Sequence, residues 1–270
     1  MGEFDLIRDY FRTTSVTRDD VLLGIGDDCA LLQVPTGRQL AMSMDTLLCG
    51  RHFSAEVDPA ALGHKALAVN LSDLAAMGAQ PAWAMLSMSL PAADAGWQRW
   101  LAAFMQGFTA LAQQYAVQLI GGDTTRGELA ITVQVSGFID LPAVLRRDAA
   151  QPGDLIYVSG NLGDAGLALH MQQGLCPKMS GWQVLQDRLH RPDPRIALGL
   201  LLAGRAHAAI DVSDGLLADL GHLCSASEVA AVVQLTDVPL SPMMQNYVAE
   251  TGDWPLALNA GDDYELLFSV

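Results

Sequence analysis

The chain has 270 residues, of which 51% are hydrophobic, so it is long enough to bury a sizeable core and, on length alone, to form about two domains. Its net charge is −15 and lysine occurs only at Lys65 and Lys178, which argues against a nucleic-acid partner, because such binding needs basic residues to displace counterions. The four cysteines form no C-x-x-C pair and predict neither a disulfide framework nor a zinc site. No apolar run is long enough to span a bilayer and no signal peptide precedes the chain, so we expect a cytoplasmic protein without a membrane partner.

Strand and helix patterns alternate along the first half of the chain, which predicts an α/β fold. VLLGIGDDCALLQV (21–34) predicts a strand, a turn and a second strand, and residues 39–47 predict another strand that ends in a polar cluster. Residues 59–79 predict a helix with Pro59 in its first turn and Gly78 near its end. This helix is apolar on nearly all sides, so we expect it to be buried.

Three further elements follow in this half. Residues 81–90 predict a strand, residues 117–127 a strand that runs into a glycine turn, and residues 129–140 a long strand. Between the first two, residues 97–115 predict a helix whose aromatic and leucine residues recur at spacings of three and four. We expect these residues to form a core face, and the alternative is a surface on which a cofactor stacks.

Residues 141–154 are rich in charge, Pro and Gly and predict a domain boundary, with one domain over 1–140 and a second over 150–270. The chain closes on a strand with no tail, so we expect the natural protein to continue beyond it. The second half again alternates between elements, with strands over 154–160, 208–213, 229–235 and 264–268 and helices over 164–174, 194–204 and 214–227.

The aspartates are the informative feature, because most of them follow predicted strands. In α/β sheets ligands bind at strand ends, so we expect these carboxylates to share one site. Asp73 belongs with them although it lies in the buried helix, where an unpaired carboxylate is costly; the alternatives are a half-exposed side chain or one paired with arginine. The strand-end acids are Asp27, Asp28, Asp45, Asp123, Asp211, Asp214, Asp262 and Asp263.

Oxygen ligands without histidine or cysteine favour Mg²⁺, which takes one or two carboxylates per ion and shares its other positions with substrate phosphates. Six or more acids therefore predict several ions that bridge a polyphosphate. The chain has no P-loop, no protein-kinase motif set and no EF-hand loop. Arg126, Arg146 and Arg147 are the basic candidates for phosphate contact, and GNLGDAG (160–166) could offer backbone N–H groups.

Several motifs occur together in a fixed order: GIGDDCALL, SMDTL, HF at His52–Phe53, KALAVNLSDLAAMGA, QLIGGDTTRG, IDVSDGL and GDDYEL. In these motifs the chain resembles the thiamine-monophosphate kinase family, which belongs to an ATP-binding superfamily that includes aminoimidazole ribonucleotide synthetase and selenophosphate synthetase. The long blocks NLSDLAAMGA and GGDTTRG make the resemblance specific, and it runs from Gly2 to the end of the chain.

The resemblance implies a two-domain α/β (α+β) fold like that of aminoimidazole ribonucleotide synthetase, in a homodimer whose N-terminal domains together close a β-barrel. It implies transfer of the γ-phosphoryl group of ATP to thiamine monophosphate, giving thiamine diphosphate, with several Mg²⁺ ions. The implied metal ligands are Asp28, Ser43, Asp45, Asp73, Asp123, Asp211 and Asp214; the ATP contacts are Gly122, Asp123, Arg147 and Ser213; the substrate contacts are His52 and Asp262. Two positions depart from the family, because Met44 and Asp262 stand where relatives often carry Thr and Glu.

The acceptor in this reaction is a phosphate oxygen that is already ionised at neutral pH, so the residues are expected to place cations and not to transfer protons. Each basic or polar contact has a structural alternative. His52 could be a packing residue beside Phe53, Arg147 a surface charge, and Ser213 the cap of a helix. Two other functions stay open: another ATP-dependent enzyme of the superfamily, and an acidic cation-binding module without enzymatic activity.

Overall fold

The computed structural model describes Phe11, residues 16–91 and residues 95–270. The chain divides into two compact units, one of residues 1–74 with 80–141 and one of residues 75–79 with 142–270, and each is described here by itself. Within the described residues, no helix has both the length and the apolar character needed to cross a membrane.

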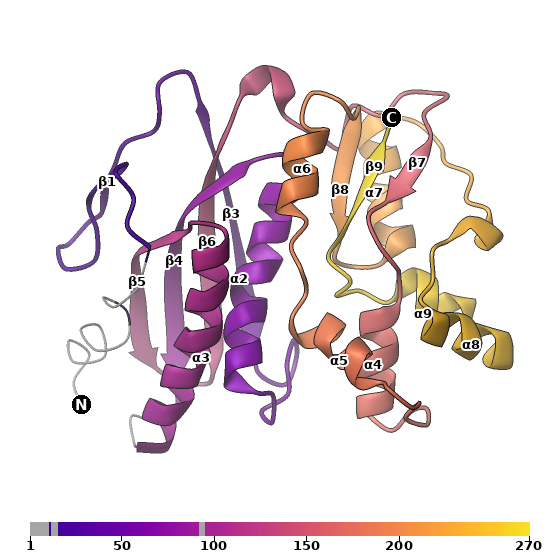
Figure 1. Cartoon of the computed structure of the whole chain (residues 1–270), viewed down its shortest axis with the longest axis horizontal. Helices are drawn as coiled ribbons and strands as arrows, with labels where there is room; N and C mark the ends of the chain where they lie inside the picture. Colours follow the sequence, from indigo (N-terminus) through magenta and orange to yellow (C-terminus); the bar gives the residue numbers. More distant parts are fainter. Residues whose placement is uncertain (1–10, 12–15, 92–94) are drawn as a thin grey trace. The chain divides into compact units, whose positions relative to one another are not determined.

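The first unit is built on a four-stranded mixed sheet with the strand order β3-β6-β4-β5. The β3–β6 and β6–β4 pairs are antiparallel, whereas β4 and β5 run parallel and are joined by a helical crossover (Figure 1). A separate antiparallel ribbon of two short strands, β1 and β2, precedes the sheet. The strands are β1 (Val21–Leu23), β2 (Leu31–Leu32), β3 (Gln39–Leu48), β4 (Gln80–Leu90), β5 (Gln118–Arg126) and β6 (Ala130–Ile139).

Two long helices, α2 (Pro59–Ala76) and α3 (Ala95–Gln114), cover one face of this sheet (Figure 1). The structure confirms the predicted burial of α2, in which most side chains from Leu62 to Ala76 are inaccessible to solvent. It also confirms the core face of α3, since Leu101, Phe104, Phe108 and Leu111 are all buried.

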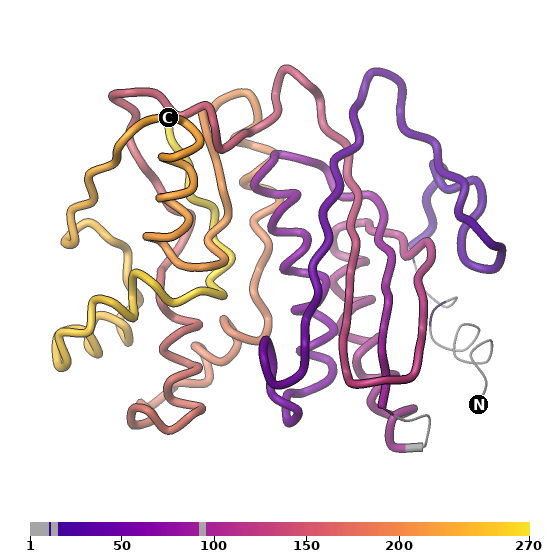
Figure 2. Tube along the Cα trace, turned by 180° about the vertical axis from the view of Figure 1, so that it is seen from behind, coloured from indigo at the N-terminus to yellow at the C-terminus, as the bar shows by residue number. Residues whose placement is uncertain are grey.

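Among the described residues no helix lies on the opposite face of the sheet, and Figure 2 views this helix-free face directly. Along β3 the side chains alternate between the two faces, so Leu40, Met42 and Met44 are exposed on the helix-free face while Leu47 is buried on the other. The β1–β2 ribbon packs against one end of the helix-free face. There Val21, Ala30 and Leu32 contact the buried cluster of Trp83, Phe138, Ala82 and Ile120.

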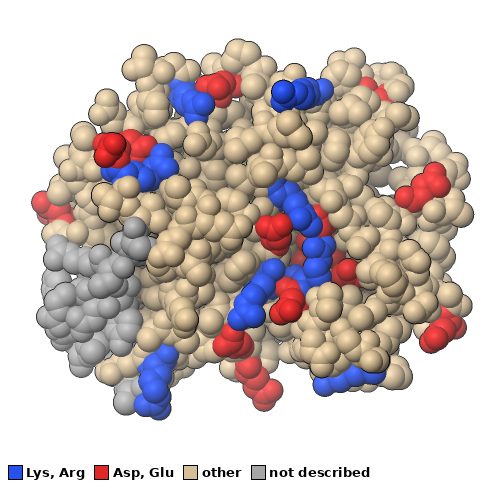
Figure 3. Space-filling model, in the orientation of Figure 1, with Lys and Arg blue, Asp and Glu red and all other residues tan. Residues whose placement is uncertain are grey.

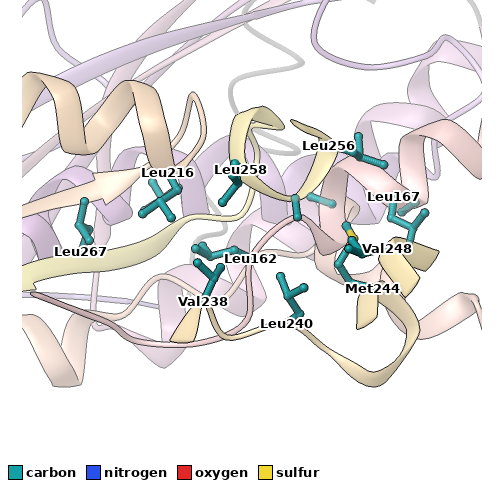
Figure 4. Close-up of a cluster of buried hydrophobic side chains, with 14 of the residues drawn as sticks. Leu162, Leu167, Leu216, Val238, Leu240, Met244, Val248, Leu256, Leu258 and Leu267 are labelled. Atoms are coloured by element: carbon teal, nitrogen blue, oxygen red, sulfur yellow. The ribbon is translucent and has the colours of Figure 1, made fainter. Parts of the chain in front are cut away.

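The second unit holds a three-stranded antiparallel sheet with the order β7-β9-β8. Its core lies between this sheet and the surrounding helices (Figure 4), and it includes Leu162, Leu216, Met244 and Leu267. The elements are β7 (Ile156–Val158), β8 (Ala208–Val212), β9 (Glu265–Ser269), α4 (Asp164–Gln172), α5 (Gln183–His190), α6 (Ile196–Leu202), α7 (Leu216–Ser227), α8 (Pro242–Thr251) and α9 (Trp254–Asn259).

The strand predicted over 229–235 is wrong, because this segment has no regular structure before a short 3-10 helix at Leu235–Asp237. Its apolar residues do alternate: Ala231 and Val233 pack against the core, while Val232 is 83% exposed. A strand also needs a neighbour for its backbone, and among the described residues this segment is not part of the β7-β9-β8 sheet. The alternation of apolar residues, which predicted a strand, therefore also occurs in a loop that packs against the core.

Candidate functional site

In the first unit, the structure brings Ser43 and Asp73 into direct contact. The Ser43 hydroxyl group donates to Asp73 Oδ2 over 2.5 Å, from the helix-covered face of β3 to α2. One turn earlier on α2, Asn70 accepts the backbone N–H of Asp45 over 3.0 Å and donates its amide to Ala66 O. The polar stripe that interrupts this otherwise apolar helix is therefore the stripe that meets β3.

Asp45 and His52 lie near each other beyond this contact. Desolvation by burial is the largest influence on the Asp45 carboxyl group and raises its pKa. His52 is exposed, and its Nδ1 atom accepts the backbone N–H of Leu48 over 3.0 Å, which leaves the ring proton on Nε2. The neighbouring Phe53 is buried, so the packing role belongs to Phe53 and not to His52.

Asp123 lies on the other face of the sheet. The strand register aligns Thr46, Thr132, Ser87 and Asp123 in one row across all four strands. The Thr46 and Thr132 hydroxyl groups are 2.8 Å apart on the helix-free face, so Asp123 points to that face too. Asp45 lies on the helix-covered side of the opposite edge strand, three strand spacings or about 14 Å away. Within this unit the structure does not bring Asp45 and Asp123 together.

The adjacent aspartates Asp27 and Asp28 lie in the exposed connection between β1 and β2. Asp27 Oδ1 accepts the backbone N–H of Asp28 over 2.8 Å, so one carboxylate stabilises the turn and holds its neighbour in place. Both side chains are in contact with solvent, which removes the desolvation penalty expected for two buried charges. Gly122, which precedes Asp123, pairs with Leu86 in the parallel β4–β5 ladder.

In the second unit, the IDVSDG and GDDYEL motifs lie side by side. Asp262 N donates to Ser213 O over 2.9 Å, and Tyr264 N donates to Val212 O over 2.8 Å, just beyond the β8–β9 ladder. The pairing brings Ser213 and Asp262 together at one end of two neighbouring strands, with Asp211 in the adjoining strand and Asp214 in the following turn. Asp211 is buried and Asp214 is exposed.

Asp262 has a left-handed backbone with φ of 70°, and its Oδ1 accepts the phenolic proton of Tyr264 over 3.2 Å. This conformation is uncommon for residues other than glycine, and aspartate is one of the few that adopt it at moderate cost. Gly261 before it must lack a side chain, because a Cβ atom there would lie 2.3 Å from Ser213 O. The loop therefore has little freedom around its predicted substrate contact.

The arginine candidates differ in their surroundings. The Arg146 guanidinium is engaged by Asp148, with a 2.7 Å bond from Nε to Oδ1. Arg147 is exposed, and only its backbone is anchored, because Ser227 Oγ donates to the Arg147 carbonyl group over 2.8 Å. This arrangement holds the backbone in place while the side chain stays exposed.

Two buried carboxylates have roles that the sequence did not predict, because Asp219 was not singled out and Asp263 was expected to share one site with the other strand-end acids. Asp219 Oδ2 accepts the backbone N–H groups of Asp214 and Gly215, and burial raises the pKa of its carboxyl group. Asp263 accepts the N–H of Gly163 over 2.6 Å and that of Ala165 over 3.3 Å. The structure therefore corrects the expectation for Asp263, because its carboxylate is buried and binds backbone N–H groups at the start of α4.

The Asp263 contacts correct the expectation for GNLGDAG. The two N–H groups at the start of α4 bind a carboxylate of the protein itself, so they are not offered to a phosphate. Burial raises the pKa of Asp263 to about 7, although both N–H bonds act to lower it. A glycine-rich sequence before a helix therefore marks a tight packing site here.

Glu265 is fully buried in the second unit and is surrounded by hydrogen-bond donors. Arg195 contacts it with Nε and Nη2, each at 2.6 Å, and Arg188 and Ser159 also donate to it. Burial alone would raise the pKa of Glu265, but these donors hold it below its ordinary value. Figure 3 shows acidic and basic side chains gathered side by side around α5 and the segment that follows it. This cluster is a structural ion-pair network.

The donor atoms of the predicted site fit a hard cation such as Mg²⁺, since the first-unit group of Ser43, Asp45 and Asp73 and the second-unit group of Asp211 and Asp214 contain only oxygen. In the part of the chain that the structure describes, no three His, Cys, Asp or Glu residues converge closely enough to hold an ion on their own. Mg²⁺ usually takes few protein carboxylates and completes its coordination with phosphate and water.

Both halves of the chain match the models of a known protein family. Residues 26–139 match the family "AIR synthase related protein, N-terminal domain", and residues 151–269 match "AIR synthase related protein, C-terminal domain". The two matches cover both units of this mixed α/β protein.

Comparison with individual proteins shows which members of this family the chain resembles. The chain is 47% identical to the thiamine-monophosphate kinase of Haemophilus influenzae over 100% of its own length and 82% of the relative. The crystal structure of thiamine-monophosphate kinase from Stenotrophomonas maltophilia K279a superposes with a TM-score of 0.90 and 50% identity, over 100% of this chain and 86% of that one. A structure described as AaThiL complexed with AMPPCP and TMP gives a TM-score of 0.80 and 32% identity, over 99% and 84%. The chain therefore belongs to the thiamine-monophosphate kinase family.

Proposed function

We propose that this protein transfers the γ-phosphoryl group of ATP to thiamine monophosphate and so forms thiamine diphosphate. The observation that carries the proposal is the 47% identity to a thiamine-monophosphate kinase over the whole chain. A relative has also been crystallised with AMPPCP and TMP, which are an ATP analogue and the proposed acceptor. The AMPPCP complex supports ATP as the phosphoryl donor, and the all-oxygen set of predicted ligands supports Mg²⁺ as the accompanying cation.

The transfer is direct and in line, and the protein acts by positioning charge. Mg²⁺, when bound, neutralises the two polyanions and stabilises charge on the transferring group. Several Mg²⁺ ions are proposed, with Asp28, Ser43, Asp45, Asp73, Asp123, Asp211 and Asp214 as their protein ligands. Asp45 and Asp123 belong to different ions, because they lie on opposite faces of the first sheet. Ser43 orients the Asp73 carboxylate through the 2.5 Å hydrogen bond. No side chain needs to accept a proton, because the acceptor oxygen is already ionised.

The remaining contacts follow from the surroundings of each residue. Gly122, Asp123, Arg147 and Ser213 contact ATP, and Arg147 does so with a side chain that is exposed on an anchored backbone. His52 contacts the thiamine phosphate by donating Nε2–H, since its Nδ1 is already an acceptor. Asp262 contacts the same substrate from the constrained loop of the second unit.

We also propose that the protein is a homodimer, with residues 1–140 as the metal- and ATP-binding and dimerisation domain and residues 150–270 as a C-terminal α/β domain. The helix-free face of the first sheet supports this, because Met42 and Met44 are 60% and 64% exposed and share this face with exposed Leu40 on β3 and exposed Met85 on β4. Large apolar side chains exposed together on one face mark an interaction site. Two copies that pair through it would close their sheets into a barrel.

The proposed activity is tested by incubating the protein with ATP, Mg²⁺ and thiamine monophosphate and measuring thiamine diphosphate by chromatography. We expect turnover by the unaltered protein and its loss in Asp73→Asn, which removes a carboxylate charge while keeping an oxygen that can accept from Ser43. Asp140→Asn, which changes an exposed acid paired with Arg38, serves as the control and should stay active.

Three outcomes would contradict the proposal. ATP turnover with another acceptor but none with thiamine monophosphate would assign the protein to a different reaction of the superfamily. Cation binding without any nucleotide turnover would favour a binding module. Near-normal rates in Asp73→Asn would remove Asp73 from the metal site.

A further inference from the structure

The turn that carries Ser213 and Asp214 is held by a side chain outside the predicted site. Asp219 is only 2% exposed, and its Oδ2 atom accepts the backbone N–H of Asp214 over 3.0 Å and that of Gly215 over 3.1 Å. Asp219 lies in the first turns of α7, so its side chain reaches back toward the residues that precede the helix. One buried oxygen thus binds two consecutive N–H groups of the turn.

The start of α7 has no side-chain cap of its own. The N-cap residue is Gly215, with φ of 110°, and it has no side chain to accept a hydrogen bond from the first turn. A larger residue would not fit, because a Cβ atom at Gly215 would lie 2.7 Å from the backbone of Asn259. The capping position therefore carries no side-chain acceptor, and Asp219 reaches back to the N–H groups of the N-cap residue and of its predecessor, as the acidic residue of a capping box does.

The same turn is held from its other side by the GDDYEL loop. The Ser213 carbonyl group accepts the N–H of Asp262 over 2.9 Å, and Gly261 packs against it so closely that no Cβ atom would fit. The backbone from Ser213 to Gly215 is thus bonded through its carbonyl oxygen on one side and its N–H groups on the other. Removing Asp219 would leave only the first of these two constraints.

We propose that Asp219 is a positioning residue of the phosphoryl-transfer site, whose carboxylate holds the Ser213–Gly215 turn in the conformation from which Asp214 and Ser213 bind Mg²⁺ and ATP. The inference rests on the proposed function for the roles of Asp214 and Ser213, but the hydrogen bonds themselves do not depend on it. Residues that orient metal ligands in this way typically change metal affinity about 10- to 100-fold when they are replaced.

The test compares Asp219→Ala and Asp219→Asn with the unaltered full chain. We expect Asp219→Ala to raise the Mg²⁺ concentration for half-maximal activity by about 10-fold or more, in line with other residues that orient metal ligands. Asp219→Asn keeps one oxygen that can accept both N–H groups, so its shift should lie between those of the unaltered protein and Asp219→Ala. Ser241→Ala is the control, because it removes another buried acceptor, the cap of α8, without touching this turn.

Two readouts do not require turnover. Amide hydrogen exchange measured by NMR should accelerate at Asp214 and Gly215 in Asp219→Ala and stay unchanged there in Ser241→Ala. Mn²⁺ binding in the presence of a non-hydrolysable ATP analogue, followed by electron paramagnetic resonance, should weaken in parallel with the shift in Mg²⁺ dependence.

A purely structural role would give a different pattern. If both Asp219 variants lose thermal stability as Ser241→Ala does, with unchanged metal dependence, the proposal is overturned. If Asp219→Ala does not fold, Asp219→Asn carries the test, and unchanged metal dependence together with unchanged exchange in that variant would overturn it. If the unaltered protein does not phosphorylate thiamine monophosphate, the proposed function fails, whereas amide exchange and Mn²⁺ binding still decide the role of Asp219.

Discussion

Buried carboxylates in the second unit accept hydrogen bonds from backbone N–H groups, and Asp263 shows how burial changes the pKa of such a residue. It is 5% exposed and accepts two N–H groups at the start of α4, where the positive end of the helix dipole favours a negative charge. Desolvation nevertheless dominates and raises its pKa to about 7. The residue therefore titrates near neutrality, far above its ordinary value of 3.8.

This shift predicts a pH-dependent stability difference for Asp263→Asn. Because the folded pKa lies above the unfolded value, the native protein binds an extra proton between about pH 4 and 7, and its stability falls as the pH rises through that window. Each pKa unit corresponds to about 1.4 kcal/mol. Asparagine imitates the neutral acid, so the free energy of unfolding of the variant relative to the unaltered protein should increase from pH 4 to pH 8.

Urea unfolding at several pH values in this range measures the difference directly, and the effects of all other groups cancel between the two proteins. A difference that does not change with pH would show that Asp263 is ionised in the same way in the folded and unfolded chains.

Helix packing in the first unit depends on two glycines. A Cβ atom at Gly63 of α2 would lie 1.9 Å from Phe104 O, and one at Gly107 of α3 would lie 1.8 Å from Ala60 O. The two helices thus approach each other through backbone atoms on both sides. A glycine inside a helix lowers its stability, but here it permits contact that no other residue allows.

We expect Gly107→Ala to destabilise the protein by about 1–3 kcal/mol, because the added methyl group forces the helices apart. Gly221→Ala is the matched control, since Gly221 also lies within a helix, α7, and a Cβ atom there would meet nothing within 4 Å. That change should stabilise the protein by about 0.5–1 kcal/mol. Denaturant unfolding measures the change in the free energy of unfolding for both variants, and we expect a decrease for Gly107→Ala and an increase for Gly221→Ala. An unchanged free energy of unfolding in Gly107→Ala would mean that the two helices accommodate the methyl group without losing stability.

Two short helices of the second unit show that local sequence signals alone are not sufficient to predict a helix. Ser241 caps α8 with Pro242 in the first turn, and Asp253 caps α9 with Pro255 in its first turn. Both pairs of residues are standard signals of a helix N-terminus. Neither helix was predicted, however, because each is too short to show a clear apolar period. Segment 229–235 shows the opposite error. Its alternating apolar residues predicted a strand, but the segment pairs with none of the described strands.

At the scale of the whole molecule, the prediction concerns assembly. Met42→Glu places a charge in the middle of the exposed apolar face of the first sheet, so we expect it to convert the proposed dimer into monomers of 28.8 kDa. Val232→Glu is the control, since Val232 is 83% exposed in the second unit and lies outside that face. Light scattering after size-exclusion chromatography measures both masses. A monomeric unaltered protein would contradict the proposed homodimer.

The sequence by itself determined most elements and the family. The 3.6-residue period of α3, the nearly all-apolar composition of α2 and the alternation along β3 are local patterns, and the ordered motifs from GIGDD to GDDYEL are specific enough to identify relatives. Such features depend on residues close in the chain, so they can be read without knowing what each segment contacts. The predicted contact residues came from the same motifs.

Only the tertiary structure decided which side chains meet. The order β3-β6-β4-β5 puts Asp45 and Asp123 on opposite faces of one sheet, although both follow the same rule of lying near strand ends. Packing also turned Asp219 and Asp263 inward to the backbone while Asp214 stayed exposed. The physical reason is that strand pairing and burial are set by contacts between residues far apart in the chain, which local propensity does not specify.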